Sequence, residues 1–317
     1  METDSPTDLA FVKMHGLGND YVYIDVFANP APADPAALAQ RIADRHRGVG
    51  GDGLILVEPS PHAAARMRMF NADGSESEMC GNGVRCVAHL VVSRGYAPAG
   101  PLTIETGRGV LPIEVVPDGR FRSQVKVDMG PPILTPAEVP VELGTGSPAP
   151  VIDQPCPDLP LRDDWVAAAG LAAGMTCVSM GNPHAIFYCR DVDAVPLEIF
   201  GPAVERHPVF PRRTNVHVVQ VIRPDHVRVR TWERGSGITQ ACGTGASAVC
   251  VAGQLTGRSG PRVTASLPGG DLLLEWSGEG SVAMTGPAEE VFTGLWHGTA
   301  LSGDVPAGGA QHHKGKS

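Results

Sequence analysis

Apolar and polar residues alternate along many short stretches of this chain, which is the pattern of strands with one buried face and one exposed face. Glycine and proline recur between these stretches, where turns are needed. The alternation runs through both halves of the chain. It predicts strands at residues 11–14, 21–27, 54–57, 66–70, 102–106, 110–116, 125–129, 175–180, 185–188, 216–222, 227–232, 263–267, 272–276, 282–285 and 291–295.

Only a few segments have the length and the end signals of helices. Asp34 can cap the first of them, and Gly95 and Gly257 stand where a C′ residue ends a helix. The expected helices are residues 35–46, 84–94, 165–171, 197–207 and 246–256. We expect residues 130–161, rich in proline, glycine and small side chains, to cross between two halves of the chain and then to form a surface loop. The composition from residue 302 onward predicts a disordered tail.

One segment of the chain occurs twice. Residues 66–70 align with residues 228–232, and Cys80 aligns with Cys242, when the second copy is placed 162 residues after the first. The glycines that follow each cysteine align as well. A period of this length does not belong to a solenoid, whose repeats run from about 20 to 50 residues. The chain is therefore expected to consist of two homologous halves.

The two cysteines carry the candidate chemistry. Each precedes a predicted helix, where free backbone N–H groups and the helix dipole favour negative charge, lower the pKa of a thiol and bind a carboxylate. The adjoining glycines let a ligand approach the backbone. Two such sites that face each other supply a base and an acid on opposite sides of one carbon atom, as its inversion by proton transfer requires. Because they would share one proton, Cys80 and Cys242 should titrate as a coupled pair.

Composition narrows the alternatives. The 317 residues include 39 glycines and 29 prolines but few aromatic residues, which favours a protein of strands and turns. A net charge of −9 without a basic stripe argues against nucleic acid. The polar start and the lack of a long apolar run predict a cytoplasmic protein that does not enter a membrane. Seven cysteines, an odd number, predict reduced thiols; no zinc-type spacing occurs, so no metal site is expected, and Cys86 and Cys250 should be core residues.

Several motifs in order along the chain carry a resemblance to one family. They are FVKMHGLGND at residues 11–20, FNADGSE at 70–76, MCGNG at 79–83, MGNPH at 180–184 and ERG with ACGTG at 233–235 and 241–245. Together they resemble diaminopimelate epimerase, over about residues 11–295.

The resemblance implies an isomerase that interconverts LL- and meso-2,6-diaminopimelate in lysine and peptidoglycan precursor synthesis, without pyridoxal phosphate or any other cofactor. The implied fold is α+β, with two pseudo-symmetric lobes that each wrap a mixed sheet around a central helix. Residues 1–130 and a final strand at about residues 286–296 would form the amino-terminal lobe, residues 131–285 the carboxy-terminal lobe, and residues 302–317 the tail. A homodimer is a candidate assembly that the sequence does not decide.

The resemblance also implies roles for individual residues. Cys80 and Cys242 match the two catalytic cysteines, either of which serves as the base. His184 and Glu233 are candidates for tuning the thiols, although a structural role suits His184 equally well. Gly53 stands where some members carry a glutamine near the thiols, so that contact is not carried over. The residues that match substrate contacts are Asn19, Asn71, Gly81, Asn82, Asn182, Asn215, Glu233, Arg234, Gly243 and Thr244.

Other functions fit fewer of these residues. A two-cysteine racemase of proline or hydroxyproline has no second amino-acid head to bind, which leaves Asn71, Glu233 and Arg234 unexplained. Related isomerases without paired cysteines do not account for Cys80 and Cys242. A redox sensor or metal carrier usually has its cysteines close together in the sequence. The sequence leaves open which thiol is ionised at rest, how far the lobes close, and whether related diamino acids react.

Overall fold

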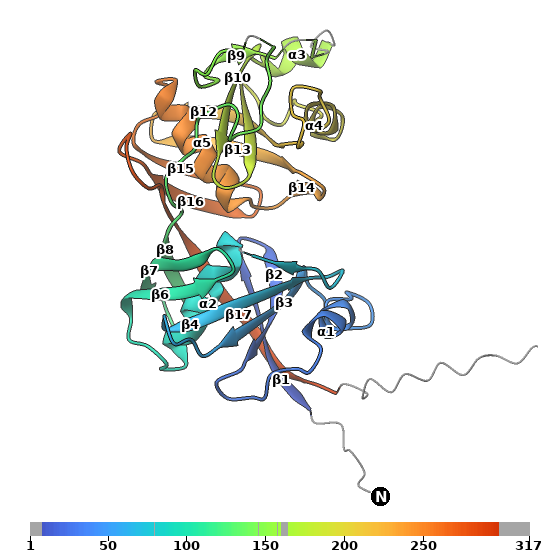
Figure 1. Ribbon diagram of the computed structural model, residues 1–317, viewed down its shortest axis with the longest axis vertical. Coiled ribbons are helices and arrows are strands. Elements are labelled where there is room, and N and C mark those ends of the chain that lie inside the picture. Colours follow the sequence, from blue (N-terminus) through green and yellow to red (C-terminus); the bar gives the residue numbers. More distant parts are fainter. Residues whose placement is uncertain (1–7, 79, 145, 157, 160–163, 298–317) are drawn as a thin grey trace, which may run out of the picture.

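The strands of this protein form two lobes stacked along its long axis, as the computed structural model in Figure 1 shows. The structure describes residues 8–78, 80–144, 146–156, 158–159 and 164–297, so the predicted disordered tail lies outside the described residues. The strands are β1 (Leu9–Gly16), β2 (Asn19–Asp25), β3 (Gly53–Glu58), β4 (Ala65–Asn71), β5 (Glu76–Ser77), β6 (Gly100–Thr106), β7 (Gly109–Pro117), β8 (Arg122–Asp128), β9 (Gln154–Pro155), β10 (Gly174–Ser179), β11 (Pro183–Cys189), β12 (Asn215–Arg223), β13 (His226–Glu233), β14 (Gly237–Thr239), β15 (Arg262–Leu267), β16 (Gly270–Glu275) and β17 (Ala283–Trp296).

The first lobe is a closed barrel. Its strands pair in the order β1, β2, β3, β4, β6, β7, β8 and β17, and β17 pairs again with β1. The second lobe repeats the same alternation of antiparallel and parallel pairs from β10 to β17. This shared pairing pattern is what a duplication predicts, and it agrees with the expected mixed sheets.

Each lobe encloses one helix, and the sequence of that helix explains its position. Helix α2 (Gly81–Ser93) has eleven buried residues and α5 (Gly243–Leu255) has ten. Small and apolar residues make up most of both helices, as expected for a helix that is covered by protein on all sides. Helices α1 (Pro35–Ile42) and α4 (Leu197–Glu205) lie against the outer faces of their lobes, while α3 (Asp164–Ala169) is a short element near β9.

Three helix boundaries differ from the sequence prediction by three residues or more. Helix α1 ends at Ile42 rather than at residue 46, because the Asp44 carboxylate accepts hydrogen bonds from the backbone N–H groups of His46 and Arg47 and so forms a turn. Helices α2 and α5 begin three residues earlier than predicted. Each starts directly after its cysteine, which becomes the N-cap residue.

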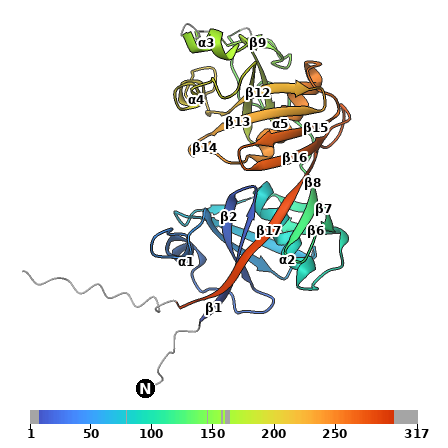
Figure 2. The same cartoon turned by 180° about the vertical axis from the view of Figure 1, so that it is seen from behind.

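The last strand is also longer than predicted. Residues 282–285 and 291–295 were expected as separate strands, but the structure has one strand, β17, that continues through Gly286 and Pro287. Pro287 pairs with β8 and not with β1. Its missing N–H group therefore removes no hydrogen bond to a second neighbouring strand. Strand β17 passes from one lobe into the other, as Figure 2 shows. The exact division of residues between the lobes stays a prediction.

Gly286 lies at this passage, and we expect Gly286→Ala to lower the free energy of unfolding by about 1–3 kcal/mol. A Cβ atom there would lie 2.4 Å from Leu272 Cδ2 and 3.3 Å from the Arg85 guanidinium. Gly260→Ala is the matched control, since its Cβ would lie 3.8 Å from the nearest atom. Urea unfolding of both variants gives the comparison; equal losses would contradict the close packing around Gly286.

No helix among the described residues has the length and apolar character needed to cross a membrane.

Candidate active site

The two cysteines of the repeat lie at helix N-termini that face each other. Cys80 is the N-cap residue of α2, and its Sγ accepts a hydrogen bond from the Gly83 N–H at 3.4 Å. Cys242 is the N-cap residue of α5. A Cβ atom on Gly243 would lie 3.9 Å from the Cα of Gly81, so the first residues of the two helices are close neighbours. The duplication therefore brings two thiols and two sets of free N–H groups to one place.

A cavity of about 1150 Å³ opens between the lobes at this point. Eleven of the thirteen residues expected at the site line it, and they come from both lobes. They are Asn19, Asn71, Cys80, Gly81, Asn82, Asn182, Glu233, Arg234, Cys242, Gly243 and Thr244. The other two, His184 and Asn215, are buried behind its wall. Asn215 donates to the Pro183 carbonyl at 2.8 Å and accepts from the Arg234 N–H at 3.0 Å, so it fixes the backbone that presents Arg234. Its direct contact with substrate stays a prediction.

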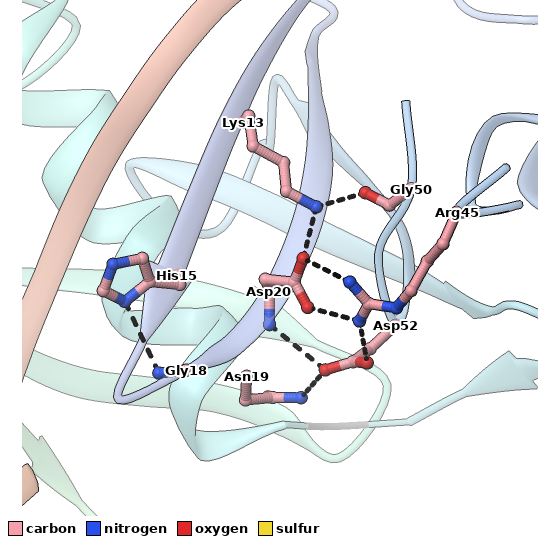
Figure 3. A network of polar contacts seen from close by, with 8 residues as sticks. All are labelled: Lys13, His15, Gly18, Asn19, Asp20, Arg45, Gly50 and Asp52. Carbon is pink, nitrogen blue, oxygen red and sulfur yellow. Dashed lines mark hydrogen bonds and ion pairs between the residues drawn. The ribbon is translucent and has the colours of Figure 1, made fainter. Parts of the chain in front are cut away.

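Asn19 is held by a network of charged groups that the sequence alone did not reveal (Figure 3). Its Nδ2 donates to Asp52 at 2.6 Å, and Asp52 is paired with Arg45 at 2.9 Å. Arg45 also binds Asp20, which in turn pairs with Lys13 at 2.5 Å. Because Nδ2 is engaged by Asp52, the Asn19 Oδ1 is left to face Cys80, whose Sγ lies 3.4 Å away.

The same network keeps the Asp20 carboxylate ionised. Burial raises the pKa of Asp20, but hydrogen bonds and the charges of Arg45 and Lys13 outweigh burial and hold that pKa below its ordinary value. A charged Asp20 keeps Arg45 in place beside Asp52. The orientation of Asn19 is therefore supported by residues of β1, of β2 and of the loop that precedes β3.

Burial controls both thiols. It raises the pKa of Cys80, although the N–H groups of Gly83 and Asn82 and the charge of Arg85 lower it. Burial raises the pKa of Cys242 further, and the Glu233 carboxylate adds to the increase. The helix N-termini were expected to lower the thiol pKa values. This expectation is wrong for the net shift, because both pKa values are raised. The N–H groups act as expected, but they are outweighed by the loss of water around the sulfurs.

Glu233 and Thr244 are the polar neighbours of Cys242. Thr239 donates a hydrogen bond to Glu233 at 2.6 Å, and the Thr244 hydroxyl lies 3.6 Å from Cys242 Sγ. Burial raises the pKa of Glu233, while hydrogen bonds from Thr239 and Cys242 act in the opposite direction. A carboxylate therefore stands beside one thiol, and an amide, Asn19, stands beside the other.

His184 reaches the site through a chain of hydrogen bonds. Its Nε2 lies 3.0 Å from Asn182 Oδ1, and the Asn182 Nδ2 donates to Thr244 at 3.3 Å. Its Nδ1 lies 2.9 Å from Nε2 of His217. Burial lowers the pKa values of both rings, to about 3 for His217, so both are neutral near pH 7. His184 thus orients Asn182, and its hydrogen bonds to described residues go to Asn182 and His217 rather than to Cys242.

Most of this chain is similar to proteins of one known family. A family model described as diaminopimelate epimerase matches residues 11–135 and 176–291. The chain belongs to the diaminopimelate epimerase family. Diaminopimelate epimerase of Moorella thermoacetica is 50% identical over 285 residues, which cover 90% of this chain and 98% of that relative. The one from Leptospira biflexa is 47% identical over 285 residues, 90% of this chain and 97% of its own.

Solved structures of lower identity resemble the fold. A PhzF-family phenazine biosynthesis protein from Bacillus anthracis has a TM-score of 0.65 at 17% identity and covers 92% of this chain and 99% of its own. A hydroxyproline epimerase from Agrobacterium vitis has a TM-score of 0.56 at 15% identity, with 91% of each chain covered. With the two enclosed helices, these matches confirm the predicted α+β fold of two pseudo-symmetric lobes.

Gly53 and Trp232 occupy tightly packed positions. A Cβ atom on Gly53 would lie 2.1 Å from the Phe70 carbonyl oxygen, so the backbone here leaves no space for the glutamine that the resemblance places there in some members. Trp232 directly precedes Glu233. Its Nε1 donates to Glu205 at 2.8 Å, and its ring packs where Gly201 lacks a side chain. Trp232 is therefore accommodated by α4.

Several residues that shape this site were not predicted from the sequence: Lys13, Arg45, Asp52, Arg85, Arg108 and His217. Arg45 and Asp52 flank a glycine-rich loop, and Arg108 lines the cavity and donates to the Met180 carbonyl at 3.4 Å. Asp52 directly precedes Gly53, the position where the resemblance places a glutamine near the thiols in some members. This neighbour was the sequence feature that could have pointed to Asp52. The other contacts depend on pairing between distant segments, which no local pattern reveals.

Proposed function

We propose that this protein interconverts LL- and meso-2,6-diaminopimelate by proton transfer between Cys80 and Cys242, without a cofactor. The observation that supports it most directly is the pair of cysteines at facing helix N-termini in one cavity. Membership of the diaminopimelate epimerase family supports the reaction and the substrate.

The reaction needs one thiolate and one thiol at the same time. The thiolate takes the α-proton from one face, so that a C–H bond breaks and an S–H bond forms. The opposite thiol then gives its proton to the other face, which inverts the carbon and leaves that sulfur as the thiolate. The reverse reaction exchanges the two roles. Either cysteine can therefore be the base, provided that only one of them is ionised.

Binding groups for the two ends of the substrate come from different parts of the cavity. The backbone N–H groups at Gly81, Asn82, Gly243 and Thr244 suit the carboxylate at the reacting centre. The far amino-acid head would be held by Asn71, Asn182, Glu233 and Arg234, which offer amide, carboxylate and guanidinium groups. Holding the unreactive end fixes the reacting carbon between the sulfurs, and this orientation is a large part of the rate. A smaller amino acid would leave those groups unused.

Proton exchange in D₂O tests the proposal. Reduced protein with LL-diaminopimelate and no added cofactor should yield meso product that carries deuterium at the inverted α-carbon, as followed by NMR. A double variant, Cys80→Ala with Cys242→Ala, serves as the blank. No exchange with diaminopimelate, but exchange with proline or hydroxyproline, would sink the substrate assignment; no exchange with any of them would sink the enzyme class.

We expect kcat/KM to rise with pH between about 6 and 9. Burial raises the pKa of both cysteines above the ordinary thiol value, so a fully protonated, inactive pair prevails at low pH. At higher pH one thiol ionises and activity appears. When the second thiol also ionises the acid is lost, and kcat/KM should fall again. A profile that stays flat from pH 6 to pH 9 would contradict this account.

We also propose a homodimer and a cytoplasmic location. Large apolar side chains are exposed on β17, namely Val291, Phe292 and Leu295, and they lie beside β1, which supports self-association there. Sedimentation velocity of the wild type against Phe292→Asp should show a dimer only in the former; a monomeric wild type contradicts the proposal.

Thiols that must stay reduced suit the cytoplasm, and fractionation of cells by antibody detection tests the location.

A further inference from the structure

A buried arginine lies directly beneath the N-terminus of α2. Arg85 is wholly inaccessible to solvent and donates to the Pro287 carbonyl at 3.1 Å and to the Gly81 carbonyl at 3.3 Å. Gly16 and Gly286 provide its space, since Cβ atoms there would lie 2.9 Å and 3.3 Å from guanidinium atoms. The backbone is therefore shaped around this side chain, although its hydrogen-bond acceptors are all neutral.

Arg85 lacks the partner that a buried cation normally has. Among the described residues no carboxylate forms an ion pair with it, and its Nη2 has no hydrogen-bond partner. Burying an unpaired charge is costly, so an anion nearby is strongly favoured. The groups near it that can become anionic are Cys80, Cys86 and Tyr23. Burial raises the pKa of all three groups, to about 11 for Cys86, but only Cys80 is half-buried and lines the cavity.

The repeat makes this arrangement one-sided. The position of α5 that corresponds to Arg85 is Ser247, whose hydroxyl donates to the Gly243 carbonyl at 3.0 Å. That carbonyl corresponds to the Gly81 carbonyl that Arg85 binds. The same place beneath the helix N-terminus thus holds a cation in the first lobe and a neutral hydroxyl in the second. The two thiols occupy equivalent positions in the duplicated sequence, but the groups beneath them differ in charge.

The charged groups on the other elements increase this difference. Glu233 of β13 is the acidic neighbour of Cys242, while the position that corresponds to it near Cys80 is the neutral Asn71. Cys80 also faces Tyr21 of β2, whose pKa is raised far above its ordinary value by burial, so that it stays neutral. Glu233 raises the pKa of both thiols, but for Cys242 it is the largest influence after burial.

We propose that Arg85 is a positioning residue whose buried guanidinium makes Cys80, and not Cys242, the thiolate of the resting enzyme. This inference rests on the two-cysteine reaction proposed above. Once one of the two thiols has ionised, the free enzyme then holds a thiolate on Cys80 and a thiol on Cys242, so it is ready to remove the α-proton from the face that Cys80 approaches. For the opposite direction, the proton must first move from Cys242 to Cys80.

Alkylation of each cysteine as a function of pH tests the inference. Reduced wild-type protein is treated with iodoacetamide between pH 5 and pH 11, and peptides that contain residues 80 and 242 are quantified by mass spectrometry. The midpoint of the pH profile reports ionisation separately from access to the sulfur. The midpoint for Cys80 should lie below that for Cys242. In Arg85→Gln it should rise by about one unit or more, because an opposite charge has been removed.

Two further variants separate charge from structure. Arg85→Lys retains the cation and should keep the Cys80 midpoint near the wild-type value. Arg94→Gln makes the same substitution at the C-cap residue of the same helix, an arginine that pairs with Glu290 at 3.2 Å, and it should leave both midpoints unchanged. Circular dichroism verifies that each variant is folded.

The outcomes distinguish this inference from the proposed function. A lower midpoint for Cys242 in the wild type overturns the role of Arg85, and so does an unchanged Cys80 midpoint in folded Arg85→Gln. If Arg85→Gln does not fold, the wild-type order of the two midpoints decides alone. Epimerisation that survives in both single cysteine variants would instead overturn the two-cysteine reaction, whatever the midpoints are.

Discussion

Alanine at Cys80 or at Cys242 is expected to lower kcat for epimerisation by about 10²- to 10⁴-fold. Either substitution removes one of the two groups that exchange protons with the substrate. Among the described residues that line the cavity, Glu233 is hydrogen-bonded to Thr239 and Cys242, and Asp52 is held by Asn19 and Arg45, so neither carboxylate is expected to replace a missing thiol. Steady-state rates with LL-diaminopimelate, followed by circular dichroism of the product mixture, give the comparison.

Cys189→Ala is the matched control for these two variants. Cys189 is also a free, partly exposed thiol, but it lies on β11 against the Val219 carbonyl and does not line the cavity. Its substitution should leave kcat within about twofold of the wild type. Near-normal turnover of Cys80→Ala or Cys242→Ala, with the control also active, would refute the assignment of the two cysteines.

Asp52→Ala is expected to lower kcat/KM by about 10- to 100-fold, although Asp52 belongs to no motif of the sequence. Without its carboxylate, the Asn19 amide is free to turn, and its Oδ1 no longer faces Cys80. The fold should persist, because Arg45 keeps its ion pair with Asp20 at 2.7 Å. Rates at several substrate concentrations and a thermal unfolding curve measure both effects.

Asp193→Ala provides the control for Asp52. Asp193 also pairs with an arginine, Arg228 at 2.9 Å, but on the exposed surface of the second lobe. The loss of such an exposed pair changes stability by no more than about 1 kcal/mol and should not alter kcat/KM. If Asp52→Ala keeps wild-type kinetics, Asn19 is positioned by something other than the network in Figure 3.

The part of the site that follows from local sequence was predictable. Cys80 and Cys242 each stand before a glycine and a helical segment, and the repetition of this pattern showed that both had the same local structure. The burial of Cys86 and Cys250 followed from their positions on these helices, and both are completely buried. A repeated motif is informative because two independent copies rarely keep the same glycines and cysteine without a common structural need.

What depends on contacts between distant segments was not predictable. Arg85 looks like an ordinary polar helix residue in the sequence, yet the barrel closes over it completely. His217 lies in an apolar strand, and only the pairing of β11 with β12 brings it to His184. The continuity of β17 was missed because Gly286 and Pro287 signal a turn locally, whereas their neighbours on β8 keep them extended. The net pKa of the thiols was also missed, since burial cannot be read from a motif.

The route of β17 has a consequence for how the chain is made. The first barrel needs this strand between β8 and β1, but β17 is the last strand described and follows the whole second lobe. During synthesis the ribosome therefore releases β1 to β8 as an open sheet with two unpaired edges, and the second lobe is translated before these edges are covered. A nascent chain that stops before residue 283 cannot close the first barrel. The cavity between the lobes is thus assembled only after the strands of both lobes have been translated.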